Sequence, residues 1–286
     1  MSATRAETKT RAVMVPGATL YVETKGAGPV LLLITGGPTD AGMFADLAGR
    51  LADRYTVVSY DQRGHSRSVL DDKPGDISVS LHADDAAALL EALGKEPASV
   101  YGNSGGATIG LELVARHPDL VRTLVVHEAP LMELLPDAER WRATFRDIDE
   151  TYRTDGVFPA MGKFGTAVEE GGPKYSEEMQ RTQPPPEAQE MMTRMAGNFE
   201  LFIAHEIQQI GAYVPDVDTL RKVPTRIVCA VGEASGEQAA RRGTIALAER
   251  LGIPVTTLPG AHGGWGSDPQ VFADKLSEVL QEGGAA

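Results

Sequence analysis

The sequence predicts an α/β fold built on a mostly parallel, doubly wound sheet. Two patterns carry this prediction: short runs that are apolar throughout, and stretches with helical periodicity that alternate with them. Strands buried on both faces, as in parallel sheets, read as continuous apolar runs. Their alternation with helices is typical of a sheet flanked by helices. The expected parallel strands are Val30–Ile34, Tyr55–Tyr60, Ala98–Tyr101, Thr123–Val126, Arg226–Val231 and Val255–Leu258.

A β-hairpin is expected to precede these strands. Ala12–Val15 and Leu20–Thr24 flank Pro16–Gly17, a dipeptide that favours a turn. With the hairpin, the predicted sheet has eight strands. The first expected helix begins at Ser80, because serine is a residue type that caps helix N-termini. The expected helices are Ser80–Leu93, Ala107–Arg116, Gln238–Leu251 and Pro269–Glu282.

One long segment, from Leu131 to about Lys222, interrupts this alternation. It has no convincing strand run, and it holds more than half of the aromatic residues and methionines of the chain. We interpret residues 131–222 as a helical cap inserted into a core domain formed by residues 1–130 and 223–286. The aromatic residues and methionines would then either form the core of the cap or line an apolar pocket, since methionine suits adaptable apolar surfaces.

The composition excludes several classes of function. The chain has 286 residues, 42% of them hydrophobic, which is enough for a large core, and its net charge of −13 disfavours nucleic acid as a partner. Cys229 is the single cysteine, so no internal disulfide or four-cysteine metal site can form. No apolar run approaches the roughly 20 residues of a membrane span. Met1–Arg11 is polar and lacks the apolar segment of a secretory signal, so we expect a cytoplasmic location.

The first motif with chemical meaning is Gly102-Asn103-Ser104-Gly105-Gly106, which fits G-x-S-x-G. It lies between an expected strand and an expected helix, which is the context of a nucleophile elbow. A sharp turn there would project the Ser104 hydroxyl above the sheet. It would also direct a helix N-terminus at the site, where negative charge is stabilised.

A second glycine-rich turn, Thr35-Gly36-Gly37-Pro38, follows the expected strand Val30–Ile34. Such a turn leaves backbone N–H groups free. The N–H groups of Gly37 and Gly105 are therefore candidate donors to a developing oxyanion, and donors of this kind lower a barrier by roughly 3–4 kcal/mol.

Residues 60–68, Tyr-Asp-Gln-Arg-Gly-His-Ser-Arg-Ser, resemble the D-x-R-G-x-G-x-S pattern of the α/β-hydrolase superfamily. His65 replaces the second glycine, and Thr35 stands where the superfamily usually has histidine. The two glycine-rich motifs follow in the order and spacing of the superfamily, so the resemblance covers Ala12 to Leu280. It implies an α/β-hydrolase fold in which Asp61 and Arg63 brace the turn beneath the site without acting as catalysts.

The resemblance requires a general base near the end of the chain, after the last strand. Of the six histidines, only His262 follows the expected strand Val255–Leu258, in a glycine-rich loop. His262 is therefore the expected base. Trp265, three residues later, is expected to form one wall of the pocket or to anchor the loop by packing. His205, in the expected cap, is a weaker candidate for contact with substrate.

The acid that orients this base has two candidate positions. After the penultimate strand, where the superfamily usually has an aspartate, the sequence has Ser235, and Glu233 comes too early to be an obvious substitute. Glu128 lies after the preceding expected strand, Thr123–Val126. A carboxylate there is costly to bury unless it is paired, and His262 would supply the partner. We expect Glu128 to be the acid, with Glu233 as the alternative.

The stretch His127-Glu128-Ala129-Pro130 is similar to the corresponding segment of the zearalenone lactonase group, whose triad is Ser–Glu–His. This resemblance implies that Ser104, Glu128 and His262 form a triad, with Gly37 and Gly105 as oxyanion donors.

The expected function is that of a serine hydrolase that cleaves a carboxylic ester or lactone with an apolar body, through an acyl-enzyme intermediate. No metal or organic cofactor is expected. Other chemistry on the same triad is an alternative, namely C–C bond hydrolysis, perhydrolysis or cyanohydrin cleavage. A slowly hydrolysing ligand receptor is another. Epoxide hydrolases and dehalogenases usually have aspartate where this chain has Ser104. The oligomeric state is left open, a homodimer included.

Overall fold

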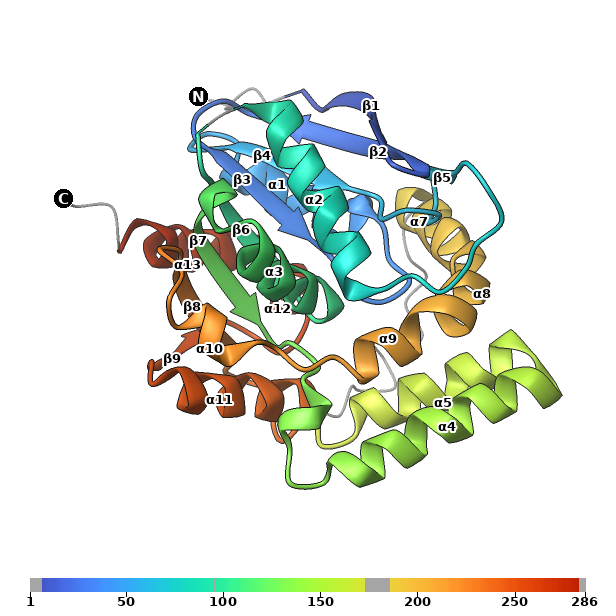
Figure 1. Cartoon of the computed structure of the whole chain (residues 1–286). Helices are drawn as coiled ribbons and strands as arrows, with labels where there is room; N and C mark the ends of the chain where they lie inside the picture. Colours follow the sequence, from blue (N-terminus) through green and yellow to red (C-terminus); the bar gives the residue numbers. More distant parts are fainter. Residues whose placement is uncertain (1–6, 95, 173–185, 283–286) are drawn as a thin grey trace.

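The structure, a computed structural model, describes residues 7–94, 96–172 and 186–282 (Figure 1). Its centre is a sheet in the order β1-β2-β4-β3-β6-β7-β8-β9, with β5 beside β2. The predicted α/β class and the mostly parallel sheet are confirmed. The strands are β1 (Lys9–Val15), β2 (Ala18–Lys25), β3 (Val30–Ile34), β4 (Thr56–Tyr60), β5 (Val69–Leu70), β6 (Ala98–Asn103), β7 (Val121–His127), β8 (Arg226–Gly232) and β9 (Val255–Leu258).

The expected hairpin is formed by β1 and β2, which pair antiparallel around Pro16–Gly17. The prediction of eight strands missed one. β5 has only two residues, which pair antiparallel with Ala18 and Thr19 of β2. Two residues are too few to show any hydrophobic pattern, so this strand has no signal in the sequence.

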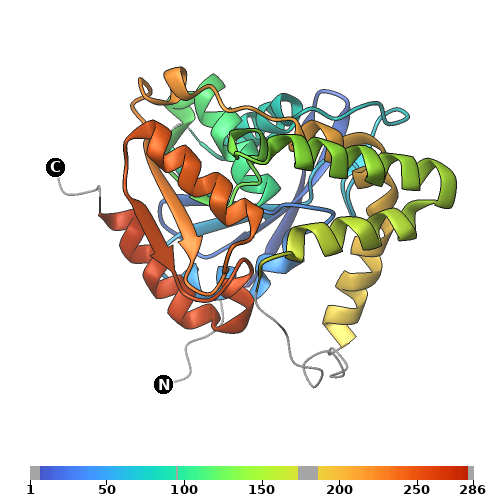
Figure 2. The same cartoon turned by 90° about the horizontal axis from the view of Figure 1, so that it is seen from below.

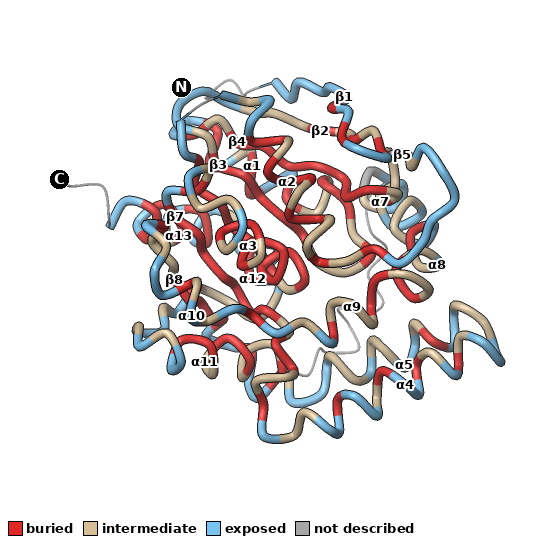
Figure 3. Tube along the Cα trace, in the orientation of Figure 1, coloured by how far each residue is buried: buried red, intermediate tan, exposed pale blue. Residues whose placement is uncertain are grey.

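Helices cover both faces of the sheet, and alternate residues of one strand point to opposite faces. Leu32 and Ile34 of β3 pack in the cluster that includes α2 (Val79–Leu93), α3 (Gly105–Arg116) and α11 (Ala239–Leu251). Leu31 and Leu33 pack in the cluster on the other face, with α1 (Ala45–Leu51) and α13 (Pro269–Gln281). Figure 3 shows the central strands buried between these layers. Cys229 of β8 is buried there, and burial raises the pKa of its thiol to about 12.

The expected cap of α2 was wrong by two residues. The helix begins at Val79, so the N-cap is Ser78, whose hydroxyl accepts a hydrogen bond from the Leu81 N–H at 3.1 Å. Ser80 already lies inside the helix, and its hydroxyl contacts that of Ser78. The short helix α1 was not expected at all, because its seven residues complete only two turns.

Residues 131–172 and 186–222, the described part of the inserted segment, contain helices and no strand. We call them the helical segment; residues 173–185 of the predicted cap lie outside the described residues. Helices α4 and α5 run side by side away from the sheet (Figures 1 and 2). The segment has a core of its own, which includes Trp141, Phe145 and Phe202. Its elements are η3 (Met132–Leu134), α4 (Ala138–Asp155), α5 (Val157–Glu169), α7 (Pro186–Gly197), α8 (Phe199–Leu201), the π-helical turn η4 (Phe202–Glu206), α9 (Ile207–Gly211) and α10 (Val217–Leu220).

A buried ion pair joins the helical segment to the sheet domain. Glu206, the last residue of η4, lies 3.0 Å from His65 Nε2 and 3.4 Å from His82 Nε2, and all three side chains are buried. Burial alone would lower the pKa of His65, but the Glu206 carboxylate outweighs it and the pKa is raised. Burial alone would raise the pKa of Glu206, but the charge of His65 and its hydrogen bond hold it below the ordinary value.

These two shifts define a pH window. A raised histidine pKa contributes stability that is present below about pH 6.5 and is lost as the pH rises through the pKa of folded His65. A lowered glutamate pKa contributes stability that is present above about pH 4.3 and is lost as the pH falls through the pKa of folded Glu206. The pair therefore contributes most between these limits.

We predict that Glu206→Gln lowers the free energy of unfolding by about 3–5 kcal/mol at pH 6, because it leaves His65 buried without its counter-charge. The difference from the wild type should shrink as the pH rises through the pKa of folded His65. Urea unfolding between pH 6 and pH 9 measures this. Glu190→Gln, at an exposed glutamate of α7, is the control and should change little. An equal effect of Glu206→Gln at both pH values would contradict the prediction.

Candidate active site

Ser104 occupies a strained turn between β6 and α3. Its φ of 55° lies in the left-handed region, which non-glycine residues seldom adopt. Its N–H donates to the carbonyl of His127 at 2.9 Å. A Cβ at Gly102 would lie 2.5 Å from the carbonyl oxygen of Gly106, and one at Gly106 would lie 2.1 Å from that of Ile34. Glycine is therefore required on both sides of the serine, as in a nucleophile elbow.

The structure brings the two predicted oxyanion donors together. Gly105 is the first residue of α3, and Gly36 and Gly37 lie in the loop after β3. A Cβ at Gly36 would lie 2.4 Å from the nitrogen of Gly105, so these two backbones pass closer than any side chain would allow. Gly37 has a φ of +60°, which favours glycine. The N–H groups of Gly37 and Gly105 thus lie beside Ser104.

Glu128 and His262 are hydrogen-bonded to each other. Glu128 follows β7 with a φ of 51° and is fully buried, and its Oε2 lies 2.7 Å from His262 Nδ1. Its Oε1 accepts from the backbone N–H of Gly232 at 2.8 Å. Burial alone would raise the pKa of Glu128, but the hydrogen bond from His262 is the largest of several contributions that outweigh it, and the pKa is lowered. The carboxyl is therefore ionised at neutral pH.

Glu233, the alternative acid, lies elsewhere. It is exposed, and its carboxylate accepts a hydrogen bond from the N–H of Gly260 at 3.1 Å. Ser104 and His262 line the same cavity, although the described contacts include no hydrogen bond between the serine hydroxyl and the imidazole. Such bonds are often long in unliganded sites and tighten only when substrate is bound.

Two polar neighbours of this site were not predicted. Asn103 donates from Nδ2 to the backbone carbonyl of His262 at 3.1 Å and so ties the histidine loop to the turn that carries Ser104. The hydroxyl of Tyr101 forms a hydrogen bond of 2.7 Å with Nδ1 of His127. Burial lowers the pKa of His127 to about 3, so this ring is neutral. The contact of Asn103 spans 159 positions, and no local pattern indicates it.

A cavity of about 360 Å³ lies between the sheet domain and the helical segment, at the small end of the range for ligand pockets. Trp265 lines it and also packs against the rings of Phe44 and Phe272, so both expected roles apply. His205 is not among the described residues of the lining and lies 3.7 Å from Asp76. The apolar side chains of the lining include Met43, Phe44, Met132, Phe145, Phe164, Phe202, Ile207 and Ile210.

Neither a metal site nor a membrane span is found in the part of the chain that the structure describes. These residues contain no group of three or more histidine, cysteine, aspartate or glutamate side chains placed to hold a metal ion. None of their helices has the length and apolarity to cross a bilayer.

The elbow, the glycine-rich loop and the histidine after the last strand define the class of an α/β hydrolase. Residues 29–200 match the family described as the alpha/beta hydrolase fold. The chain belongs to this family and is one of its hydrolases, which confirms the predicted superfamily and fold.

Among known proteins, the uncharacterized hydrolase YraK of Bacillus subtilis is 35% identical over 277 residues, which cover 94% of this chain and 95% of that protein. A thermophilic esterase from Thermogutta terrifontis has a TM-score of 0.72 at 21% identity and covers 97% of this chain and 99% of its own. The enol-lactonase from Burkholderia xenovorans has a TM-score of 0.70 at 19% identity, over 95% and 100% of the two chains. Likeness at this level of identity shows the fold alone.

The glycine contacts at the elbow generate a stability prediction. Gly106→Ala should lower the free energy of unfolding by about 1–3 kcal/mol, because its Cβ would overlap the carbonyl of Ile34. Gly162→Ala in α5 is the matched control. A Cβ there meets nothing within 4 Å, so alanine should stabilise the helix by about 0.5–1 kcal/mol. Chemical denaturation measures both, and equal effects in the two variants would refute the argument.

Proposed function

We propose that this protein is a serine hydrolase that cleaves a carboxylic ester or lactone through an acyl-enzyme intermediate. The observation that carries the proposal is the 2.7 Å hydrogen bond between Glu128 and His262, a histidine that lines the same cavity as Ser104. An ionised, buried carboxylate on Nδ1 leaves Nε2 as the proton acceptor for a serine. This arrangement supports the triad of Ser104, Glu128 and His262 that the resemblance to the zearalenone lactonase group implies.

In the proposed mechanism, His262 takes the hydroxyl proton of Ser104 as Oγ attacks the carbonyl carbon. The oxyanion of the tetrahedral intermediate accepts hydrogen bonds from the N–H groups of Gly37 and Gly105. Glu128 stabilises the imidazolium. The C–O bond to the alcohol then breaks, and the alcohol leaves with the proton from His262. Water adds to the acyl group by the same steps, which releases the acid and restores Ser104.

The cavity lining favours a neutral substrate of small to medium size with an apolar body. The described lining is dominated by aliphatic, methionine and aromatic side chains, and it contains no lysine or arginine that would bind a carboxylate of the substrate. We further propose that residues 131–222 act as a cap domain on a core of residues 1–130 and 223–286. Phe145, Phe164 and Phe202 of the helical segment line the same cavity as Ser104, which supports this role.

The first test is reaction with a fluorophosphonate probe, followed by intact-mass measurement. The wild-type protein should gain one adduct, because an activated serine displaces fluoride from phosphorus. Ser104→Ala should gain none. An adduct of equal extent on both proteins would place the reactive group elsewhere and refute the proposal.

The second test separates the two candidate acids. Glu128→Ala should lower kcat for a p-nitrophenyl ester roughly 10³–10⁴-fold, because His262 loses the group that fixes its tautomer and stabilises its charge. Glu233→Ala should stay near the wild type. The two substitutions are matched, because each removes a glutamate from a loop that follows one of two neighbouring strands. A large loss of kcat in Glu233→Ala with a wild-type kcat in Glu128→Ala would identify Glu233 as the acid.

A further inference from the structure

The loop that carries the proposed donor Gly37 is not held in place by packing at that residue. A Cβ at Gly37 would meet nothing within 4 Å, so no other part of the protein packs against that side of the residue. Glycine has more conformational freedom than any other residue. An oxyanion donor must nevertheless be fixed in direction, because its effect depends on preorganisation. Contacts of the residues on either side of Gly37 must therefore hold it in place.

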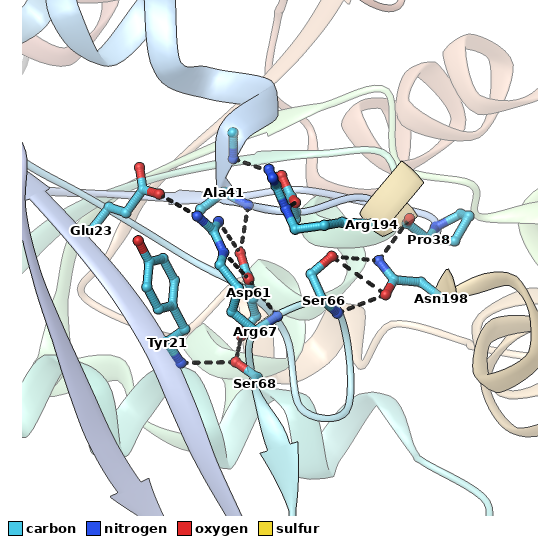
Figure 4. A network of polar contacts seen from close by, with 12 residues as sticks. Tyr21, Glu23, Pro38, Ala41, Asp61, Ser66, Arg67, Ser68, Arg194 and Asn198 are labelled. Carbon is cyan, nitrogen blue, oxygen red and sulfur yellow. Dashed lines mark hydrogen bonds and ion pairs between the residues drawn. The ribbon is translucent and has the colours of Figure 1, made fainter. Parts of the chain in front are cut away.

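On one side, the sheet domain anchors this loop (Figure 4). The carboxylate of Asp61 accepts a hydrogen bond from the N–H of Ala41 at 2.9 Å and is itself held by Arg67 at 2.7 Å. Thr39 donates from its hydroxyl to the carbonyl of Gly36 at 2.8 Å. The Thr39 bond holds the peptide that bears the Gly37 N–H, and the Asp61 bond holds the far end of the loop. The carbonyl of Pro38, on the other side of Gly37, is left to another partner.

That partner is Asn198, between α7 and α8 in the helical segment (Figure 4). Its side-chain nitrogen Nδ2 donates to the carbonyl of Pro38 at 3.1 Å. Its oxygen Oδ1 accepts from the backbone N–H of Ser66 at 2.6 Å. Because only the amide oxygen can accept from Ser66, the amide nitrogen must face Pro38. Asn198 is 2% exposed, so water does not compete for these bonds.

A second contact comes from the same helical face. Arg194, four residues earlier, donates from Nε to the buried carboxylate of Asp40 at 2.7 Å. Residues four apart lie on one face of a helix. The two side chains thus reach the loop at positions 38 and 40, so the helical segment holds the part of the loop nearest Gly37.

We propose that Asn198 is a positioning residue for the oxyanion hole, acting through Pro38 on Gly37. The inference rests on the proposed function. The ring of Pro38 restricts its φ, and the bond from Asn198 to its carbonyl fixes the chain on the C-terminal side of Gly37. The bond from Thr39 to the Gly36 carbonyl fixes the peptide on the N-terminal side, which bears the Gly37 N–H. With both sides fixed, Gly37 keeps its conformation and its N–H keeps its direction. The residue touches neither the substrate nor the reacting atoms. Its effect should therefore appear in the rate of the step that forms an oxyanion and not in the affinity for the unreacted probe.

The test uses a fluorophosphonate, whose phosphoryl oxygen takes the place of the oxyanion when Ser104 attacks phosphorus and fluoride leaves. Asn198→Asp keeps the acceptor for Ser66 but places an oxygen against the Pro38 carbonyl. Asn198→Ala removes both bonds without adding charge. In both variants we expect the inactivation rate constant to fall roughly 10–100-fold. This decrease does not exceed the decrease in rate that follows removal of a whole oxyanion donor. The dissociation constant of the probe should stay within about twofold of the wild-type value.

Thr193→Ala is the matched control. Thr193 lies in α7, the helix that precedes Asn198, is exposed, and donates to the carbonyl of Gln189, so the variant should react at the wild-type rate. If Asn198 served only to stabilise the fold, its substitution would lower the fraction of protein that the probe labels, but the folded molecules would keep the wild-type inactivation rate constant. A wild-type rate constant in folded Asn198→Ala would overturn the inference alone. Failure of the wild-type protein to react would overturn the proposed function and this inference with it.

Discussion

The site depends on the approach of backbones to distances that no side chain would permit. Three backbone segments meet around Ser104: the end of β6 at Gly102, the start of α3 at Gly106 and the loop after β3 at Gly36. At each of these glycines, a backbone atom of another residue occupies the space that a Cβ would need. This contact aligns the N-terminus of α3 with the loop after β3. It also holds Ser104 in a left-handed conformation that the surrounding structure must maintain. The position of every other group in the site is set relative to this junction.

The second constraint is the burial of charge. A fully buried carboxylate is tolerated only where hydrogen bonds or an opposite charge replace water. Glu128 has hydrogen bonds with the Gly232 N–H and with Nδ1 of His262. Glu206 has His65 and His82. The pair of Glu128 and His262 lies at the ends of the central strands, and the pair of Glu206 and His65 lies where the helical segment meets the sheet domain. The cost of burying a carboxylate therefore constrains both the candidate site and the contact between the helical segment and the sheet domain.

The strands were predictable because burial on both faces leaves a continuous apolar run, and β3 and β9 have the predicted bounds. The contact of Glu128 with His262 followed from the cost of burying a carboxylate, and the structure has that contact; the roles of the residues remain a proposal. Arg194 and Asn198 were not predictable. Their partners in the loop after β3 lie more than 150 positions away, and an arginine or asparagine on an amphipathic helix is otherwise interpreted as an exposed residue.

The π-helical turn η4 affects the angle, around the helix axis, between two groups of residues that contact the sheet domain; we call these residues anchors. Arg194 and Asn198 contact the loop after β3 on one side of this turn, and Glu206, at its end, contacts His65. Each residue of a helix advances the chain by about 100° around the axis, and a π-turn holds one residue more than an α-turn. Removal of that residue would turn one group of anchors about 100° away from its partners while the other stayed in place. The extra residue of η4 is therefore part of the geometry by which the helical segment meets the sheet domain at both places.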